Sequence, residues 1–310
     1  MMENLLAIVT QPAFYQSVLR LATSLLIAAM GDLVAERSGV LNMGLEGLML
    51  VGALFGFLGA YFTGSPWLGL LIAIVAAVVI GALLAFCCID LALPQTVVAV
   101  AVNLLCAGLC GTLLRAVFGA ANAASQCEGF KLFVPKFLDK FPVLQTVLSQ
   151  YWFTYFAILL IPITWFVFNK TTVGLKIRAV GEDPKAASTM GIKVRKVRYL
   201  SVLYSAALCG IAGTFLSMTA LCTYVDDMAA GRGYIAFAAV IFGKFTPLGA
   251  ALGALVFGFA DALQLNLQAT GAEIPYQFLL MLPYAITLVV LFIGRAGNSP
   301  KSWAEPYISE

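Results

Sequence analysis

Five stretches of the sequence, each about 20 residues or longer, contain no charged side chain and are long enough to cross a bilayer as an α-helix. They are Gly47–Ile89, Leu91–Leu114, Tyr151–Asn169, Tyr199–Val225 and Ile274–Gly294. The composition excludes an ordinary soluble domain, because 62% of the residues are hydrophobic and only 11% are charged, whereas about a quarter of the residues of a soluble domain carry charge. The sequence therefore predicts an all-α fold: a polytopic transmembrane helical bundle forming a single domain over residues 1–310.

We expect about eight crossings, including broken or re-entrant helices. Glycine, lysine and proline interrupt an apolar stretch at Gly243–Pro247, which predicts a half-helix followed by a full one. The polar loop Gly119–Gln150 should carry a short amphipathic helix near its end. The expected crossings are Ala13–Leu33, Gly39–Phe62, Pro66–Asp90, Pro94–Phe118, Tyr151–Asn169, Tyr199–Tyr224, the broken element after Gly233, and Pro275–Gly294.

The distribution of basic residues predicts the orientation of the bundle. Segment Lys170–Arg198 contains eight lysines and arginines, whereas the loop Gly119–Gln150 contains three lysines. Loops rich in lysine and arginine stay in the cytoplasm. We therefore place Lys170–Arg198 on the cytoplasmic side, together with the tail that carries Arg295 and Lys301, and the N-terminus outside.

The residue types argue against catalysis by this chain. It has no histidine, and histidine is the commonest general base and metal ligand. Most of its seven cysteines lie in apolar runs, where cysteine serves as a small packing residue, and their spacing does not match a zinc site. We therefore expect no enzyme activity, and neither a metal nor a cofactor bound by this chain.

A short helix is predicted between two crossings, within the basic segment. Asp183 can cap it, Pro184 suits its first position, and Gly191 suits its C-terminal end. A helix over Pro184–Met190 is too short to be stable alone. It is therefore either an ordinary interfacial loop or a coupling helix that docks onto a cytoplasmic partner.

Polar residues also interrupt the apolar runs near the second crossing. Asn42 and Glu46 are four residues apart and should share a helix face. A carboxylate in the membrane faces a partner or a wet cavity. Glu46 should therefore line a pathway, pair with Arg37, or cap a broken helix, and the glycines of this stretch favour a broken or re-entrant segment.

Two pairs of glycines are spaced four residues apart, Gly52 with Gly56 and Gly249 with Gly253. This spacing places both glycines of a pair on one helix face, where they let two backbones approach closely. We expect both pairs to be helix-packing sites.

Three separated stretches resemble permeases of the ABC importer family that handles branched-chain amino acids, ribose-type sugars and nucleosides. The first is Glu36–Met49, with the sequence Glu-Arg-Ser-Gly-Val-Leu-Asn-Met-Gly-Leu-Glu-Gly-Leu-Met. The second is Gly174–Ile192, which resembles the coupling loop of that family, and the third is Gly231–Lys244. Within the family, the chain looks most like the nucleoside branch, which works with a lipid-anchored binding protein.

The resemblance implies a permease subunit of an ATP-driven importer in the cytoplasmic membrane. It would move nucleosides, purine nucleosides in particular; a ribose-type sugar permease and an ion-coupled secondary transporter are the alternatives. The implied partners are a second, different permease, cytoplasmic ATPases, and a substrate-binding lipoprotein outside. Membrane lipid surrounds the chain, and no nucleic acid is expected. The sequence has no phosphate-binding loop, so ATP would bind to another polypeptide.

Two groups of residues are the candidates for function. The first would line or flank the solute pathway, although interhelical hydrogen bonding or core packing is the alternative for each member: Asn42, Glu46, Phe55, Asn103, Phe237 and Phe242. The second would couple the chain to the ATPase: Gly181, Glu182, Asp183, Pro184, Ala186, Ala187 and Gly191.

Overall fold

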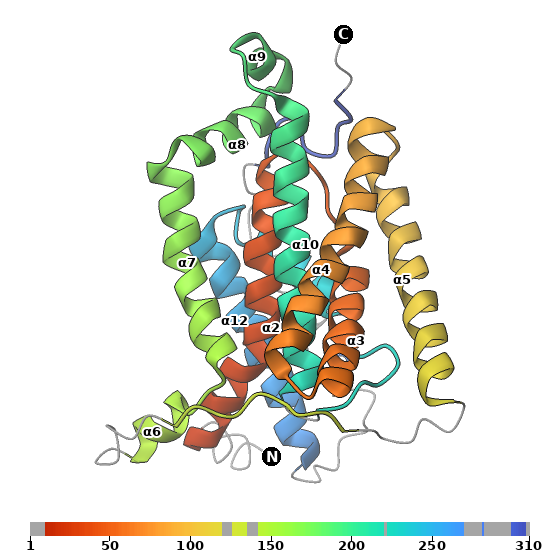
Figure 1. Cartoon of the computed structure of the whole chain (residues 1–310). Helices are drawn as coiled ribbons and strands as arrows, with labels where there is room; N and C mark the ends of the chain where they lie inside the picture. The colour runs from red at the N-terminus through yellow and green to blue at the C-terminus, as the bar shows by residue number, and fades with distance from the viewer. Residues whose placement is uncertain are drawn as a thin grey trace.

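The computed structural model describes residues 10–119, 126–134, 142–219, 222–269, 281 and 299–307, and it confirms a bundle of α-helices (Figure 1). Seven described helices are long and apolar enough to cross a membrane. They are α2 (Pro12–Arg37), α3 (Leu45–Thr63), α4 (Pro66–Ala85) with its π-helical extension η1 (Phe86–Asp90), α5 (Gln95–Phe118), α7 (Trp152–Lys170), α10 (Val194–Met218) and α12 (Pro247–Ala269). The expected crossing Pro275–Gly294 lies outside the described residues, apart from Met281.

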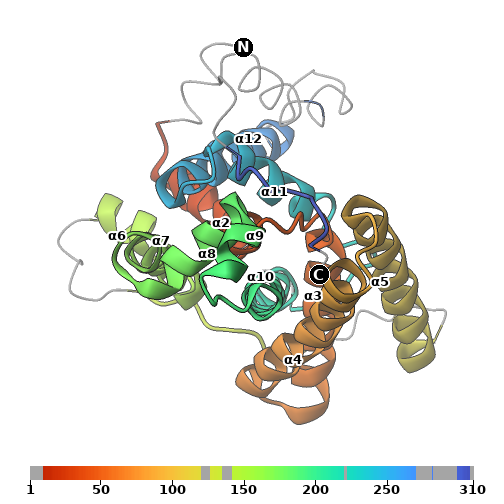
Figure 2. The ribbon, with the colours of Figure 1, turned by 90° about the horizontal axis from the view of Figure 1, so that it is seen from above.

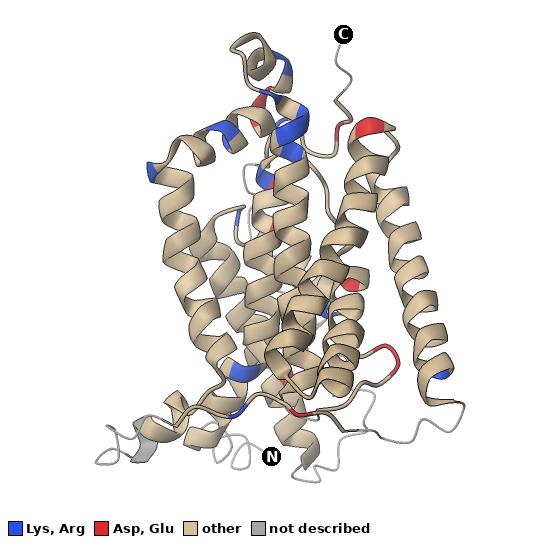
Figure 3. Cartoon of the chain, viewed as in Figure 1, with Lys and Arg blue, Asp and Glu red and all other residues tan. Residues whose placement is uncertain are grey.

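Four shorter helices complete the described fold. They are α6 (Pro142–Leu148), α8 (Thr172–Glu182), α9 (Pro184–Thr189) and α11 (Arg232–Phe242). Helix α6 lies at the end of the bundle where α2 begins, whereas α8 and α9 lie at the opposite end (Figure 1). The end with α8 and α9 also gathers most of the lysines and arginines (Figure 3), so the positive-inside rule predicts that this end faces the cytoplasm.

Helix α10 is at the centre of the bundle and packs along α2, α3 and α4 (Figure 2). Its buried residues include Val202, Ala206 and Cys209, which belong to the same apolar core as Leu25 and Phe57. By contrast, α4, α5, α7 and α12 each keep exposed apolar faces. In a bilayer such faces can contact lipid at no hydrophobic cost.

Glycines allow the central helices to approach one another. A Cβ atom at Gly213 of α10 would lie 2.1 Å from the carbonyl oxygen of Met49 in α3, and one at Gly52 would lie 2.6 Å from the carbonyl oxygen of Gly210. Similarly, a Cβ atom at Gly249 of α12 would lie 2.1 Å from the carbonyl oxygen of Gly243, just after α11. Both glycine pairs singled out in the sequence therefore belong to close backbone contacts.

The start of the second crossing differs from the prediction. We expected a helix from Gly39, but α3 begins at Leu45, and residues 38–44 descend from the end of α2 into the bundle as turns and irregular backbone (Figure 1). Gly39 has a φ of +86°, which a helix cannot accommodate. Asn42 therefore precedes the helix, so the prediction that Asn42 and Glu46 share a helix face is wrong.

The break in the seventh element is confirmed. Helix α11 ends at Phe242, and α12 begins at Pro247. Lys244 and Phe245 both have a φ of 53°, which turns the chain back on itself. The hydroxyl of Thr246 then accepts a hydrogen bond from the backbone N–H of Gly249 at 3.2 Å, in the first turn of α12.

We expect Gly213→Val to destabilise the bundle more than Gly108→Val. A Cβ atom at Gly108 on α5 has no described neighbour within 4 Å, whereas one at Gly213 would clash with the α3 backbone. Overpacking of this kind costs about 1–3 kcal/mol, and both substitutions carry the same change in helix propensity. Thermal unfolding of the two purified variants in detergent measures the difference. Equal melting temperatures would show that the α3–α10 contact tolerates a side chain.

Candidate functional site

Glu46 links the start of α3 to the start of α11. Its two carboxylate oxygens accept hydrogen bonds from the backbone N–H groups of Gly231, at 2.8 Å, and Gly233, at 2.7 Å. These N–H groups have no partner inside helix α11, because they lie at its N-terminus, where a negative charge is also favoured by the helix dipole. The side chain of Glu46 is only 7% exposed. Glu46 therefore caps the half-helix α11 from a distant part of the chain.

Asn103 of α5 makes three hydrogen bonds in the same region. Its Oδ1 accepts from the backbone N–H of Gly47 at 2.9 Å, and its Nδ2 donates to the carbonyl oxygen of Met43 at 3.0 Å and to the hydroxyl of Tyr234 at 2.9 Å. Tyr234 lies in the first turn of α11 and is 42% exposed. Asn103 thus joins α5 to the starts of α3 and α11, beside an accessible aromatic ring.

Asn42 faces a different neighbour. Its Nδ2 donates to the hydroxyl of Ser205 on α10 at 3.0 Å, and its backbone N–H donates to Glu36 at 2.9 Å. The side chain is fully buried, and its Oδ1 has no hydrogen-bond partner among the described residues. The structure therefore brings Glu46 and Asn103 together around the start of α11, whereas Asn42 points toward α10.

The three candidate phenylalanines, Phe55, Phe237 and Phe242, are partly buried, and all three pack against the main apolar core. Phe242 lies over Phe257 of α12, with ring centroids 5.9 Å apart. Arg37, which could have paired with Glu46, instead donates through Nε to the carbonyl oxygen of Phe245 at 2.7 Å.

The segment around α9 is ordered by local hydrogen bonds and a small apolar cluster. The Asp183 carboxylate caps α9 by accepting from the N–H of Ala186 at 3.0 Å. Ala187 is buried against Val180 and Val194, and Gly191 takes a φ of +80° just beyond the helix. The exposed side chains of this segment are Glu182, Asp183, Lys185, Ala186, Ser188, Thr189 and Met190.

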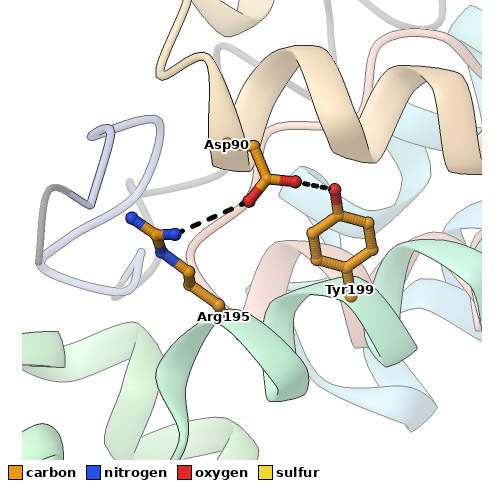
Figure 4. Close-up of polar contacts among 3 residues, drawn as sticks. All are labelled: Asp90, Arg195 and Tyr199. Atoms are coloured by element: carbon orange, nitrogen blue, oxygen red, sulfur yellow. Dashed lines mark hydrogen bonds and ion pairs between the residues drawn. The ribbon is translucent and has the colours of Figure 1, made fainter.

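Two further contacts hold together the end of the bundle that carries α8 and α9. Asp90, at the end of η1, lies between Arg195 and Tyr199 of α10 (Figure 4). The Arg195 nitrogen is 3.8 Å from the carboxylate, and the Tyr199 hydroxyl donates to the other oxygen. At this exposed site the ion pair adds little stability, but it fixes the register of α4 against α10.

Residues 299–307 dock onto the same end, a contact that sequence reasoning missed. The Ser302 hydroxyl donates to the carbonyl oxygen of Gly181 at 2.7 Å, and the Trp303 indole N–H donates to the Glu36 carboxylate. Arg198, only 1% exposed, donates to the carbonyl oxygen of Glu305 at 3.0 Å. Arg198 belongs to α10, so the sixth crossing begins earlier than the expected Tyr199. The tail thereby connects α2, α8 and α10.

We expect Glu46→Gln to loosen the start of α11. A glutamine keeps one side-chain carbonyl oxygen but replaces the other oxygen with an NH2 group, which cannot accept a hydrogen bond from Gly231 or Gly233. Losing one charge-assisted acceptor from a buried pair of N–H groups costs about 1–3 kcal/mol. Hydrogen exchange of residues 226–236 in the purified chain should accelerate, while exchange in α7 stays unchanged. Unchanged exchange at Gly231–Gly233 would contradict the capping role.

Comparison with known proteins identifies the family. Residues 14–291 match the family described as branched-chain amino acid transport system / permease component. The guanosine ABC transporter permease protein NupQ of Bacillus subtilis is 39% identical to this chain over 93% of both chains. The guanosine ABC transporter permease protein NupP of the same Bacillus subtilis strain is 26% identical, over 90% of this chain and 80% of its own length. A permease protein named for glucose transport, TsgC13 of Haloferax volcanii, is 40% identical over 80% of this chain and 75% of its own. The chain therefore belongs to the branched-chain amino acid permease family and is a multi-pass, non-catalytic permease subunit of an ABC importer, which works with ATPase and substrate-binding partners.

Proposed function

We propose that this permease moves nucleosides, purine nucleosides above all, into the cell. The observation that carries the proposal is the similarity to the guanosine permease NupQ along nearly the whole of both chains. Membership of the ABC permease family excludes the ion-coupled secondary transporter considered above. A sugar is the second candidate, because the glucose-named TsgC13 is equally similar over a shorter stretch.

The geometry around the start of α11 suits a neutral polar solute. The amide of Asn103 and the hydroxyl of Tyr234 are uncharged, and both oxygens of Glu46 are already bonded to backbone N–H groups. A nucleotide would need a cluster of cations, whereas the described residues place a single arginine, Arg232, beside Glu46. A nucleoside offers hydroxyls for the amide and a flat base for the Tyr234 ring.

We further propose that the permease works as a heterodimer with a second, different permease, driven by cytoplasmic ATPases and supplied by a binding lipoprotein outside. Support for the heterodimer comes from the similarity of the chain to two guanosine permease proteins of one strain, NupQ and NupP. The asymmetry of those two identities, 39% against 26%, supports NupQ rather than NupP as the counterpart of this chain.

The coupling role falls to α9. The segment that carries this role in the proposal includes Gly181, Glu182, Asp183, Pro184, Ala186, Ala187 and Gly191. Ala187 and Gly181 attach the segment to the bundle, since Ala187 is buried and a Cβ atom at Gly181 would lie 2.2 Å from the Arg37 carbonyl oxygen. Ala186 and the exposed Met190 face outward, where an ATPase can contact them.

Uptake of labelled guanosine tests the solute. Cells that carry this subunit with its partners should accumulate guanosine, and cells lacking it should not. Excess adenosine should compete, whereas excess ribose or glucose should leave guanosine uptake unchanged. Full competition by glucose with no competition by adenosine would establish the sugar alternative.

Substitution of Tyr234 tests the proposed contact with the base. Tyr234→Phe keeps the ring and should retain most uptake, although Asn103 loses one hydrogen-bond partner. Tyr234→Ala removes the ring, and stacking on an aromatic side chain contributes about 1–3 kcal/mol per base. Guanosine uptake should therefore fall by roughly tenfold at limiting guanosine, since each 1.4 kcal/mol is a factor of ten. Equal uptake by the alanine and phenylalanine variants at equal protein level would exclude the contact.

A matched pair of substitutions tests the coupling role. Ala186→Asp places a charge on the exposed face of α9 and should leave protein level intact, while uptake and solute-stimulated ATP hydrolysis fall together. Ala187→Asp buries an unpaired carboxylate against Val180 and Val194, a change that costs several kcal/mol, so that variant should lose protein level instead. Normal uptake by the Ala186→Asp variant would rule out α9 as the coupling surface.

A further inference from the structure

An apolar pocket of about 850 Å³ opens between α7, α8 and the start of α10. This volume lies within the range of about 300–1,000 Å³ that is typical of small-molecule sites. Three lysines belong to its lining, Lys176 from α8, Lys193 just before α10 and Lys196 in its first turn. Its apolar lining includes Ile163, Val167, Val173, Ile177, Leu200 and Tyr204. An apolar hollow with cationic groups along its lining suits an amphipathic, anionic molecule.

The three lysines are available to a ligand. All three side chains are exposed. The ion pair found in the described part of the chain joins Arg195 to Asp90, so none of these lysines is engaged by a described carboxylate. They lie at the cytoplasmic end of the bundle, where clusters of lysine and arginine attract the anionic headgroups of that leaflet.

Thr164 provides an independent observation inside the pocket. Its side chain is buried, with 3% exposure, and lines the cavity. Its hydroxyl has no hydrogen-bond partner among the described residues. A hydroxyl buried at membrane depth without a partner is costly. An ester oxygen of a glycerolipid would give this hydroxyl an acceptor, which a plain hydrocarbon chain or a detergent tail could not.

The position of the pocket argues for lipid rather than for another permease. Helices α7 and α8 lie on one side of the bundle, whereas α5, which carries Asn103, lies on the other (Figure 2). The pocket therefore opens away from the residues proposed to contact the solute. Two residues of its lining, Ile163 on α7 and Leu200 on α10, are exposed apolar side chains, which suits contact with lipid.

We propose that this pocket binds one anionic phospholipid of the cytoplasmic leaflet. The lipid phosphate lies among Lys176, Lys193 and Lys196, and an ester oxygen on the lipid's glycerol accepts a hydrogen bond from the Thr164 hydroxyl. The acyl chains follow the groove between α7 and α10. The lipid thereby fills the space between the crossing α7 and the segment that carries α8 and α9.

Native mass spectrometry of the purified full-length chain tests the proposal. Phosphatidylglycerol and phosphatidylcholine with identical acyl chains are titrated into the detergent-solubilised protein. The wild-type chain should retain one phosphatidylglycerol more tightly than any phosphatidylcholine. The variant Lys176→Gln, Lys193→Gln, Lys196→Gln should bind phosphatidylglycerol on the order of tenfold more weakly or worse, while its weak binding of phosphatidylcholine stays unchanged and shows that it is folded.

Two controls separate the pocket from general surface charge. The variant Lys170→Gln, Lys185→Gln, Lys301→Gln removes the same charge outside the pocket and should bind phosphatidylglycerol as the wild type does. Leu200→Trp fills the groove without changing charge and should weaken binding, whereas Val75→Trp on the exposed face of α4 should not. Inorganic phosphate should fail to compete, because it lacks acyl chains.

Three results would overturn the proposal. They are equal retention of the two lipids by the wild type, equal loss of phosphatidylglycerol in the two lysine variants, and displacement of the lipid by inorganic phosphate. The proposal would also fail if a pocket variant bound lipid normally but no longer associated with the partner permease, because the groove would then be a protein interface.

Discussion

Each break in a helix inside a bilayer leaves backbone N–H groups that lipid cannot bond, so the protein or a water-filled cavity must supply their partners. This requirement explains the most polar contacts of the bundle. The Glu46 carboxylate takes the N–H groups of Gly231 and Gly233 at the start of α11. The irregular segment 38–44 is held in the same way, since Glu36 accepts from the N–H of Asn42 and Gln95 accepts from that of Leu41. These buried polar side chains thus bond the backbone N–H groups at two helix breaks, which allows α3 and α11 to begin inside the bundle.

The helix breaks in turn determine what the rest of the bundle can do. Because α3 and α11 both begin within the bundle, Asn103 and Tyr234 gather near two helix starts rather than along the flank of one helix. Continuous helices would bury their own backbone groups and present only side chains. The interrupted ones concentrate hydrogen-bonding groups at one place, which a polar solute needs for passage through hydrocarbon.

Much of the architecture could be predicted from the sequence, because hydropathy and proline position act locally. The starts of α4 and α5, the break after α11 and the short helix α9 all follow from residues within a few positions of each boundary. The start of α3 did not follow, since Val40 and Leu41 are apolar and continue the run. The non-helical path of residues 38–44 depends on Glu36, which accepts from the N–H of Asn42, and on Gln95, which accepts from the N–H of Leu41 and lies 54 residues away.

The candidate site was predictable only in part, for a related reason. Glu46 and Asn103 stand out as polar residues in apolar runs, but their partners lie far along the chain, Gly231 being 185 residues from Glu46. Tyr234 looks like an ordinary membrane aromatic until Asn103 is seen to bond it. The Trp303–Glu36 contact spans 267 residues and leaves no local pattern. The periodicity of apolar residues shows whether a side chain is buried or exposed. Which distant residue it bonds across the bundle depends on tertiary packing.

The docked tail has a consequence for the order in which this end of the bundle is completed during synthesis. Ser302 bonds the end of α8 from 121 positions further along the chain. At a synthesis rate of about 5–20 residues per second, this separation corresponds to roughly 6–24 s on the ribosome. During that interval, α8 and the buried guanidinium of Arg198 lack the partners that residues 302–305 supply. The contacts that hold the end of α8 and Arg198 are therefore completed only after the described membrane helices have been synthesised.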